Sequence, residues 1–144
     1  WKKPEETAKA LQDGFFHTGD VGLLDEHGFL FIKDRAKDIV IRGGENIACA
    51  EVEYALSDHP AVCEAAVYGL PDERLGEVVA ASVQIRSEDA VSVEALQAFL
   101  QSRIAHFKVP TCIKLQTAQL PRIATGKIAK KEIRQAVLAQ QSSL

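Results

Sequence analysis

The chain has 144 residues, of which 47% are hydrophobic and 26% are charged. These are ordinary values for a globular protein, and they exclude a disordered, collagen-like or low-complexity chain. With 17 basic and 20 acidic residues the net charge is −3, so the chain lacks the positive field typical of nucleic-acid-binding proteins.

The first 35 residues predict a β-hairpin that follows a short helical stretch. Two apolar runs within residues 21–33 flank the turn Asp25-Glu26-His27-Gly28, in which Gly28 supplies the backbone freedom of a bulged hairpin loop. The next segment, residues 34–38 (DRAKD), has no large apolar residue. We therefore place a boundary there, with one unit at residues 1–35 and a second at residues 36–144.

The second unit predicts the element order β, α, β, β, α, β, α. The expected elements are a strand at 38–42, a helix from Ala50 to Pro60, strands at 61–69 and 78–86 joined by a polar loop, a helix from the N-cap Ser92 to Ile104, a strand at 112–115 and a final helix from Ala129 to Val137. This order predicts an α+β fold with a small mixed sheet and flanking helices.

Three cysteines, Cys49, Cys63 and Cys112, form no CxxC pair, which favours buried free thiols in a reducing, cytoplasmic compartment. No apolar run approaches about 18 residues, so we expect no transmembrane segment. The four histidines show no metal-ligand spacing, and we predict no metal site. The chain begins Trp-Lys-Lys-Pro and has no methionine, so we expect a piece of a longer protein.

Two polar residues of the first unit are candidates for binding a nucleotide. Asp20 ends the turn Thr18-Gly19-Asp20, and a carboxylate can accept both hydroxyls of a ribose. Arg35 offers forked donors that suit phosphate or ribose oxygens. The structural alternative for Asp20 is a solvated residue at a strand end, and that for Arg35 is a weak ion pair at the surface. Lys37, in the boundary segment, is either a hinge residue that absorbs a rotation between domains or a solvated lysine.

The segment Gly43-Gly44-Glu45-Asn46 has two interpretations. Missing side chains let a ligand or another chain pass close to the backbone. Alternatively, the glycines form a tight turn and Asn46 caps the following helix.

The most distinctive local sequence is Pro121–Lys127 (PRIATGK), at the start of a basic C-terminal stretch. Residues 121–144 hold five basic residues and one acidic residue, which leaves a net charge of −7 for the first 120 residues. A Walker A loop is excluded because Pro121 and Ile128 stand where that motif needs Gly and Ser or Thr. Lys127 is then either an ammonium that meets negative charge in an acyl or phosphoryl reaction, or a solvated lysine in a loop before a helix.

Four segments in this order resemble the C-terminal end of an adenylate-forming enzyme of the acyl-CoA synthetase type. They are GFFHTGD, IKDRAKDIVIRGGENIACAEVE, VYGLPDERLGEVVAASV and LPRIATGKIAKKEIR. The resemblance runs from about Gly14 to Arg134. The GGEN form of the glycine segment resembles fatty-acyl and aryl CoA ligases more than carrier-loading adenylation domains.

The resemblance implies a ligase that acts in two steps. A carboxylic acid attacks ATP to give an acyl-adenylate and pyrophosphate, and the acyl group then passes to the thiol of CoA with release of AMP. For the first step it implies that Asp20 binds the ribose hydroxyls and that Arg35 contacts ribose or phosphate. It also implies that Lys127 bridges the substrate carboxylate and the nucleotide.

For the second step the resemblance implies that the small domain rotates about Lys37. Gly43, Gly44 and Glu45 would then lie beside the pantetheine arm of CoA, and Lys108 would offer a cation to the CoA phosphates.

The phosphate loop of this family, and its adenine-binding motif with a magnesium-coordinating glutamate, do not occur in the sequence. The resemblance therefore assigns Mg²⁺ and most of the ATP site to a large N-terminal domain, of which residues 1–35 are the remnant. It also implies that the fragment alone is inactive. Two alternatives stay open: an adenylating enzyme that loads a carrier protein, and a non-catalytic module that keeps the fold.

Overall fold

The computed structural model describes residues 1–141, and the chain divides into two compact units, Trp1–Lys37 and Asp38–Leu144. The division falls inside the segment 34–38, two residues after the expected boundary. Each unit is described by itself.

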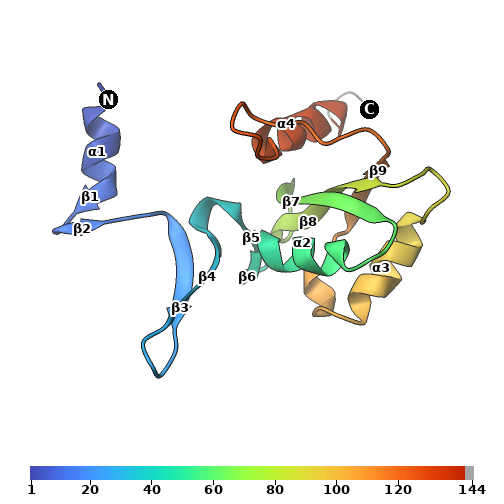
Figure 1. Ribbon diagram of the computed structural model, residues 1–144, viewed down its shortest axis with the longest axis horizontal. Coiled ribbons are helices and arrows are strands. Elements are labelled where there is room, and N and C mark those ends of the chain that lie inside the picture. Colours follow the sequence, from blue (N-terminus) through green and yellow to red (C-terminus); the bar gives the residue numbers. More distant parts are fainter. Residues whose placement is uncertain (142–144) are drawn as a thin grey trace. The chain divides into compact units, whose positions relative to one another are not determined.

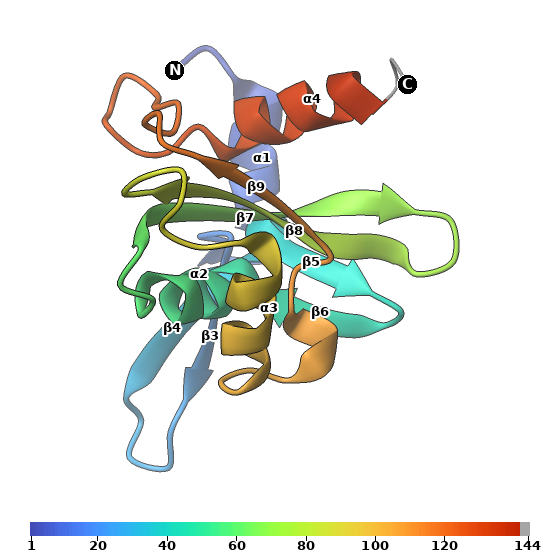
Figure 2. The ribbon, with the colours of Figure 1, turned by 90° about the vertical axis from the view of Figure 1, so that its right-hand side faces the viewer.

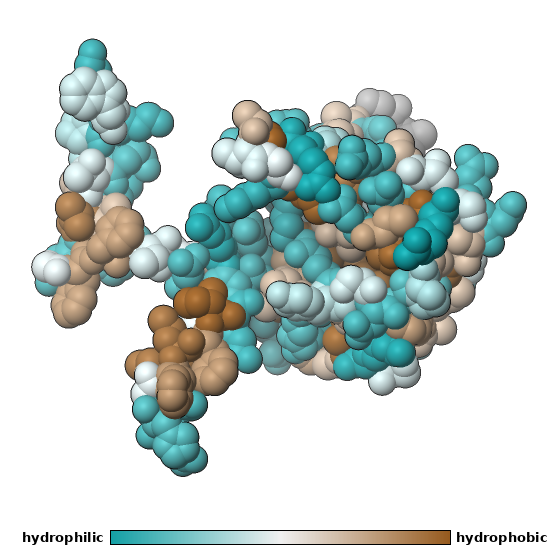
Figure 3. Space-filling view, in the orientation of Figure 1, coloured by the Kyte–Doolittle hydropathy of each residue, from teal (hydrophilic) through white to brown (hydrophobic). Residues whose placement is uncertain are grey.

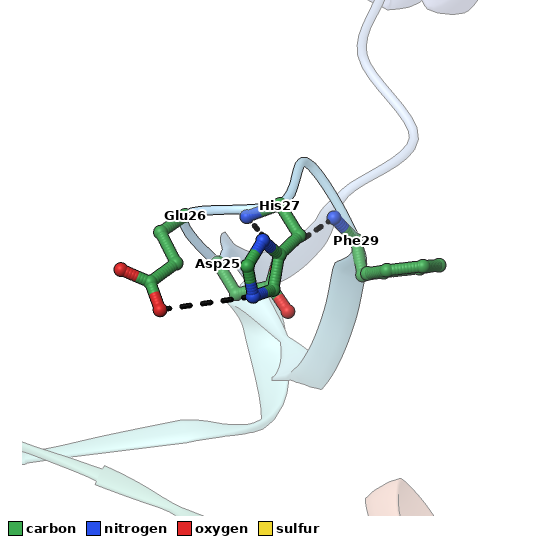
Figure 4. Close-up of polar contacts among 4 residues, drawn as sticks. All are labelled: Asp25, Glu26, His27 and Phe29. Atoms are coloured by element: carbon green, nitrogen blue, oxygen red, sulfur yellow. Dashed lines mark hydrogen bonds and ion pairs between the residues drawn. The ribbon is translucent and has the colours of Figure 1, made fainter.

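The first unit consists of short elements without a buried core. They are α1 (Pro4–Ala10), β1 (Leu11–Gln12), β2 (Phe15–Phe16), β3 (Asp20–Leu24) and β4 (Leu30–Arg35), followed by the 3-10 turn η1 (Ala36–Asp38). β3 and β4 form an antiparallel hairpin, and the Asp25 carboxylate closes its turn by accepting the amides of His27 at 2.9 Å and Phe29 at 2.8 Å (Figure 4). No side chain of residues 1–37 is buried. Because an isolated two-stranded hairpin is only marginally stable in water, this unit needs a partner surface.

The second unit is a five-stranded mixed sheet with helices on both faces (Figure 1). Its elements are β5 (Ile39–Arg42), β6 (Glu45–Ala48), α2 (Cys49–Ser57), β7 (Val62–Asp72), β8 (Gly76–Ile85), α3 (Val93–Gln101), the 3-10 turn η2 (His106–Lys108), β9 (Cys112–Gln116) and α4 (Lys130–Gln141). The strands lie in the order β6-β5-β8-β7, and β9 pairs with β8 in parallel while the other pairs are antiparallel. The predicted fold class is confirmed.

Strand alternation gives the sheet two apolar faces, each covered by helices (Figure 2). On one face, α2 and α3 bury Leu56, Leu96 and Leu100 against the odd-numbered residues of β8. On the other face, α4 buries Ile133 and Val137. Burial of one leucine side chain stabilises the folded state by about 1.5–3 kcal/mol relative to exposure. The two cores therefore make the sheet a rigid base for its loops.

The glycine segment differs from its predicted place. Residues 45–48 form β6, so Gly43 and Gly44 are the two central residues of a β-hairpin turn rather than a break before a helix. Their φ angles are +57° and +89°, as a tight hairpin turn of this hand requires. The helix α2 begins at Cys49 with Ala48 as its N-cap, so the alternative in which Asn46 caps this helix is wrong.

Three further details differ from the sequence expectations. The residues predicted to form a polar loop after residue 69 mostly belong to β7 and β8. The backbone pairing of β7 continues to Asp72, and that of β8 begins at Gly76. The helix α3 ends at Gln101 instead of continuing to Ile104. All three cysteines are free thiols, but while Cys49 is buried, Cys112 is half-buried and Cys63 is exposed, so the predicted burial is wrong for Cys63. Among residues 1–141, no helix combines the length and apolar character needed to cross a bilayer.

Tyr68, on the α4 face of the sheet, predicts a pH dependence of stability. It is 6% exposed and its hydroxyl lies 2.8 Å from the Ser82 hydroxyl. Burial raises the pKa of the Tyr68 phenol, against the opposing effect of the Ser82 hydrogen bond. The unfolded chain releases this proton near its ordinary pKa of about 10, whereas the folded chain keeps it, so the free energy of unfolding falls as the pH rises above that value.

We expect Tyr68→Phe to weaken this alkaline loss while lowering stability at neutral pH by about 1–3 kcal/mol, because Ser82 loses its partner. Urea unfolding at pH 8 to 11 measures both effects. Tyr54→Phe is the matched control, since Tyr54 is 75% exposed and should leave the pH dependence as it is. An unchanged alkaline slope in Tyr68→Phe would contradict the prediction.

Candidate functional site

In the first unit, the two predicted nucleotide-binding residues lie opposite each other. Asp20 begins β3 and Arg35 ends β4, and the two are direct cross-strand partners. The Arg35 Nε lies 3.2 Å from the Asp20 Oδ1, and the Asp20 amide donates to the Thr18 hydroxyl at 3.1 Å. With 55% of the Arg35 side chain and 29% of the Asp20 side chain exposed, one anionic and one cationic group face solvent together. Such a pair can accept hydroxyls and donate to oxyanions at one place.

Lys37 is an exposed residue in the 3-10 turn η1 and the last residue of the first unit. Its side chain has no hydrogen bond or ion pair among the described residues. A rotation of the backbone here would therefore break no hydrogen bond or ion pair of the Lys37 side chain among the described residues. The hinge role stays a prediction.

In the second unit, the turn between β5 and β6 is held from one side and open on the other. The Gly43 amide donates to the Leu75 carbonyl at 2.8 Å, and a Cβ added at Gly43 would lie 3.3 Å from the Leu75 side chain. A Cβ added at Gly44 would meet no atom within 4 Å. Gly44 and the exposed Glu45 thus border free space, into which a narrow ligand can approach the backbone.

Glu77 supports this hairpin and was not predicted from the sequence. In the backbone ladder, β5 pairs with β8 at Arg42 and Gly76. Beyond that pair the Glu77 carboxylate accepts the Ile41 amide at 3.1 Å, in place of a backbone carbonyl. The same carboxylate lies 3.6 Å from the Arg134 guanidinium of α4. No local sequence signal reveals this role, because the partners lie 36 and 57 residues away.

Lys108, the predicted CoA-phosphate contact, already has a partner. Its ammonium lies 2.7 Å and 2.8 Å from the two carboxylate oxygens of Glu51, and 21% of its side chain is exposed. A phosphate at this position must compete with Glu51 for the same ammonium.

Lys127 lies at the end of a small hairpin between β9 and α4. Arg122 and Ile128 form an antiparallel bridge, the Ile123 amide donates to the Lys127 carbonyl at 2.9 Å, and the Gly126 amide donates back to the Ile123 carbonyl at 2.9 Å. The Lys127 side chain is exposed, and among the described residues it has no hydrogen bond or ion pair. The backbone of Lys127 is hydrogen-bonded within the hairpin, and its ammonium is open to solvent.

The next lysine along the chain has a different environment. Burial acts to lower the pKa of Lys130, but its hydrogen bond and its attraction to Glu53 outweigh that effect and raise the pKa. The Lys130–Glu53 ion pair spans 2.8 Å. Lys130 therefore ties the start of α4 to α2, and its charge is paired with Glu53. The Lys127 ammonium, in the hairpin, can meet an external anion.

Arg122 is a second residue that sequence reasoning missed. One end of its guanidinium donates to the Gly126 carbonyl at 2.6 Å, and the other donates to the Glu64 carboxylate on β7. Within residues 1–141 no three His, Cys, Asp or Glu side chains gather as metal ligands.

The chain is similar to known proteins over most of its length. The profile of the AMP-binding enzyme C-terminal domain matches residues 51–127. The chain is 47% identical over 133 residues to a long-chain-fatty-acid–CoA ligase of Bacillus subtilis, covering 92% of this chain and 24% of the relative. It is 44% identical over 134 residues to the fatty acid–[acyl-carrier-protein] ligase ScoC of Streptomyces coeruleorubidus, covering 93% of this chain and 26% of that relative.

Solved structures give the same result. The o-succinylbenzoate CoA synthetase of Bacillus subtilis, in complex with its acyl-adenylate intermediate, matches with a TM-score of 0.80 at 39% identity. The match covers 88% of this chain and 25% of the synthetase chain. The same synthetase in complex with ATP and a magnesium ion has a TM-score of 0.83 at 37% identity, covering 92% and 27%. The chain thus spans about a quarter of the length of the relatives it matches.

Proposed function

The chain belongs to the AMP-binding enzyme C-terminal domain family, and we propose that it is the C-terminal part of an ATP-dependent acyl-CoA synthetase. In the first half-reaction a carboxylate oxygen attacks the α-phosphorus of ATP, forming an acyl-adenylate as the bond to pyrophosphate breaks. In the second, the sulfur of CoA attacks the acyl carbon, and the bond to AMP breaks. The thiol proton is lost to solvent or base. The free thiols of the chain favour a reducing, cytoplasmic compartment.

The observation that carries the proposal is the state of Lys127. Its ammonium has no partner among the described residues, while its backbone carbonyl accepts the Ile123 amide within the hairpin. A positioned cation that is not yet neutralised is what the first half-reaction needs, because negative charge gathers where the carboxylate meets the α-phosphate. In this role Lys127 bridges the acid and the nucleotide.

The exposed apolar surface of the first unit favours a large N-terminal domain as its partner. Large apolar side chains such as Phe16, Leu24 and Phe31 are exposed there, and Figure 3 shows this gathering of hydrophobic residues in brown. Exposed patches of this kind mark an interface. We propose that residues 1–35 complete the large domain, and that this domain binds Mg²⁺ and most of the ATP. Asp20 and Arg35 then form the edge of the nucleotide site, Asp20 on the ribose and Arg35 on ribose or phosphate.

The turn between β5 and β6 serves the second half-reaction. The pantetheine arm of CoA is narrow, and it passes beside Gly43, Gly44 and Glu45, where side chains are missing or exposed. A rotation about Lys37 exchanges this face for the Lys127 face between the two steps. Lys108 contacts the CoA phosphates in competition with Glu51.

The proposal is tested with the full-length protein, ATP, Mg²⁺, CoA and a panel of fatty and aromatic carboxylic acids. We expect AMP, pyrophosphate and acyl-CoA in equal amounts with at least one acid, and acyl-adenylate when CoA is left out. A carrier protein bearing a phosphopantetheine arm replaces CoA in a parallel reaction. Faster transfer to the carrier than to CoA would favour a carrier-loading enzyme, and no adenylate with any acid would favour a non-catalytic module.

We expect the isolated 144-residue chain to release no pyrophosphate with any acid, ATP, Mg²⁺ and CoA. The physical reason is that the chain has no metal-ligand cluster within residues 1–141 and no glycine-rich phosphate loop to hold the triphosphate. A pyrophosphate-release assay at high protein concentration measures this, with the full-length protein as the positive control. Turnover by the isolated chain would show that the missing domain is not required.

A further inference from the structure

The hairpin that carries Lys127 is held at its base but exposed at its tip. Leu120 and Ala129, on either side of the hairpin, are 2% and 3% exposed and belong to the packed part of the unit. Between them, residues 121–127 are all exposed. The single antiparallel bridge between Arg122 and Ile128 does not fix a conformation by its own backbone hydrogen bonds. Some other contact must set where the tip, and with it Lys127, lies over the sheet.

Arg122 makes that contact. Its guanidinium spans the hairpin to the Gly126 carbonyl and at the same time reaches the Glu64 carboxylate on β7. The side chains of Arg122 and Glu64 are 33% and 32% exposed, so the protein covers about two thirds of each while water still reaches the pair. Planar forked donors join two acceptors in a fixed geometry, which a lysine cannot do.

We propose that the Arg122–Glu64 pair is a positioning device that locks the Lys127 hairpin onto β7 and thereby sets the rate of acyl-adenylate formation. The proposal rests on the proposed function of Lys127. Arg122 and Glu64 need not touch the substrate, because they act through the hairpin. The core contacts of Leu120 and Ala129 remain when the pair is lost, so the unit stays folded while the tip moves.

The test uses the full-length protein with Arg122→Leu, Glu64→Leu and the double variant. We expect each single variant to lower kcat for acyl-adenylate formation by about 10- to 100-fold, the range expected when a reacting group is misplaced by about 1 Å. KM for ATP and the transfer of a supplied acyl-adenylate to CoA should stay unchanged. The double variant should be no slower than the slower single one, because both remove one interaction. Arg122→Lys should recover only part of the rate.

Two controls separate positioning from general damage. Arg86→Leu removes an arginine that holds the Pro60 carbonyl at 2.7 Å in another loop, and it should leave both half-reactions unchanged. Arg122→Leu added to Lys127→Ala should cause no further loss, since the pair acts through Lys127. Equal loss in both half-reactions, or a loss that adds to that of Lys127→Ala, would overturn the proposal.

Amide hydrogen exchange distinguishes this proposal from the proposed function itself. We expect Arg122→Leu to speed exchange at the Ile123 and Gly126 amides, which the hairpin protects. If the wild-type protein makes no adenylate with any acid, the proposed function fails, and this readout still reports whether the pair holds the hairpin. Unchanged exchange at both amides would show that it does not.

Discussion

Replacing Lys127 with alanine in the full-length protein will lower the rate of acyl-adenylate formation by about 10²–10³-fold, the usual loss when one donor to a developing oxyanion is removed. The transfer of a supplied acyl-adenylate to CoA will be largely spared. The difference follows from the proposed rotation about Lys37, which brings Lys127 to the carboxylate and α-phosphate oxygens in the first half-reaction and replaces it with the turn between β5 and β6 in the second. Pyrophosphate exchange and single-turnover thioester formation measure the two steps separately.

Lys131→Ala is the matched control for Lys127→Ala. Lys131 is also an exposed lysine without a partner among the described residues, and its removal changes the net charge by the same amount. It lies on α4 rather than on the hairpin, so both half-reactions should keep their rates. Equal losses in the two half-reactions of Lys127→Ala would refute the role assigned to Lys127.

The features predicted well from the sequence are those that depend on local periodicity or on motif order. Apolar spacing places α3 and the β3–β4 hairpin, and the α+β class follows from the order of elements. The order of four motifs identifies the family, although each motif is weak alone. The hairpin register brings Asp20 and Arg35 opposite each other, while their nucleotide-binding roles stay predictions.

The features that the sequence did not reveal depend on contacts between distant residues. β6 is a strand because it pairs with β5 across a two-residue turn, and a glycine pair predicts a break equally well. Glu64 and Glu77 look like ordinary charged strand residues, and only the fold shows that one holds Arg122 and the other holds the Ile41 amide. Lys108 has the same limitation, since its partner Glu51 lies 57 residues away.

The turn between β5 and β6 leads to a prediction at Gly44, which complements the prediction for Lys127 in the hairpin before α4. Gly44→Asn will slow the transfer of acyl-adenylate to CoA by about tenfold or more, equivalent to at least ~1.4 kcal/mol, while acyl-adenylate formation keeps its rate. A side chain at this position enters the open space beside the turn, where the pantetheine arm is proposed to pass. Asparagine is chosen because it tolerates positive φ better than other side chains.

Backbone strain at Gly44 must be separated from obstruction of the ligand. Gly28 is the matched control, because its φ of +83° is close to the +89° of Gly44, and a Cβ at either position meets no atom within 4 Å. Gly28→Asn carries the same strain in the turn between β3 and β4, far along the chain from the proposed CoA path, and should leave the transfer step unchanged. A rise in KM for CoA in Gly44→Asn alone would identify obstruction. If both variants slowed the transfer step alike, strain would explain the loss, and the turn between β5 and β6 would have no part in binding CoA.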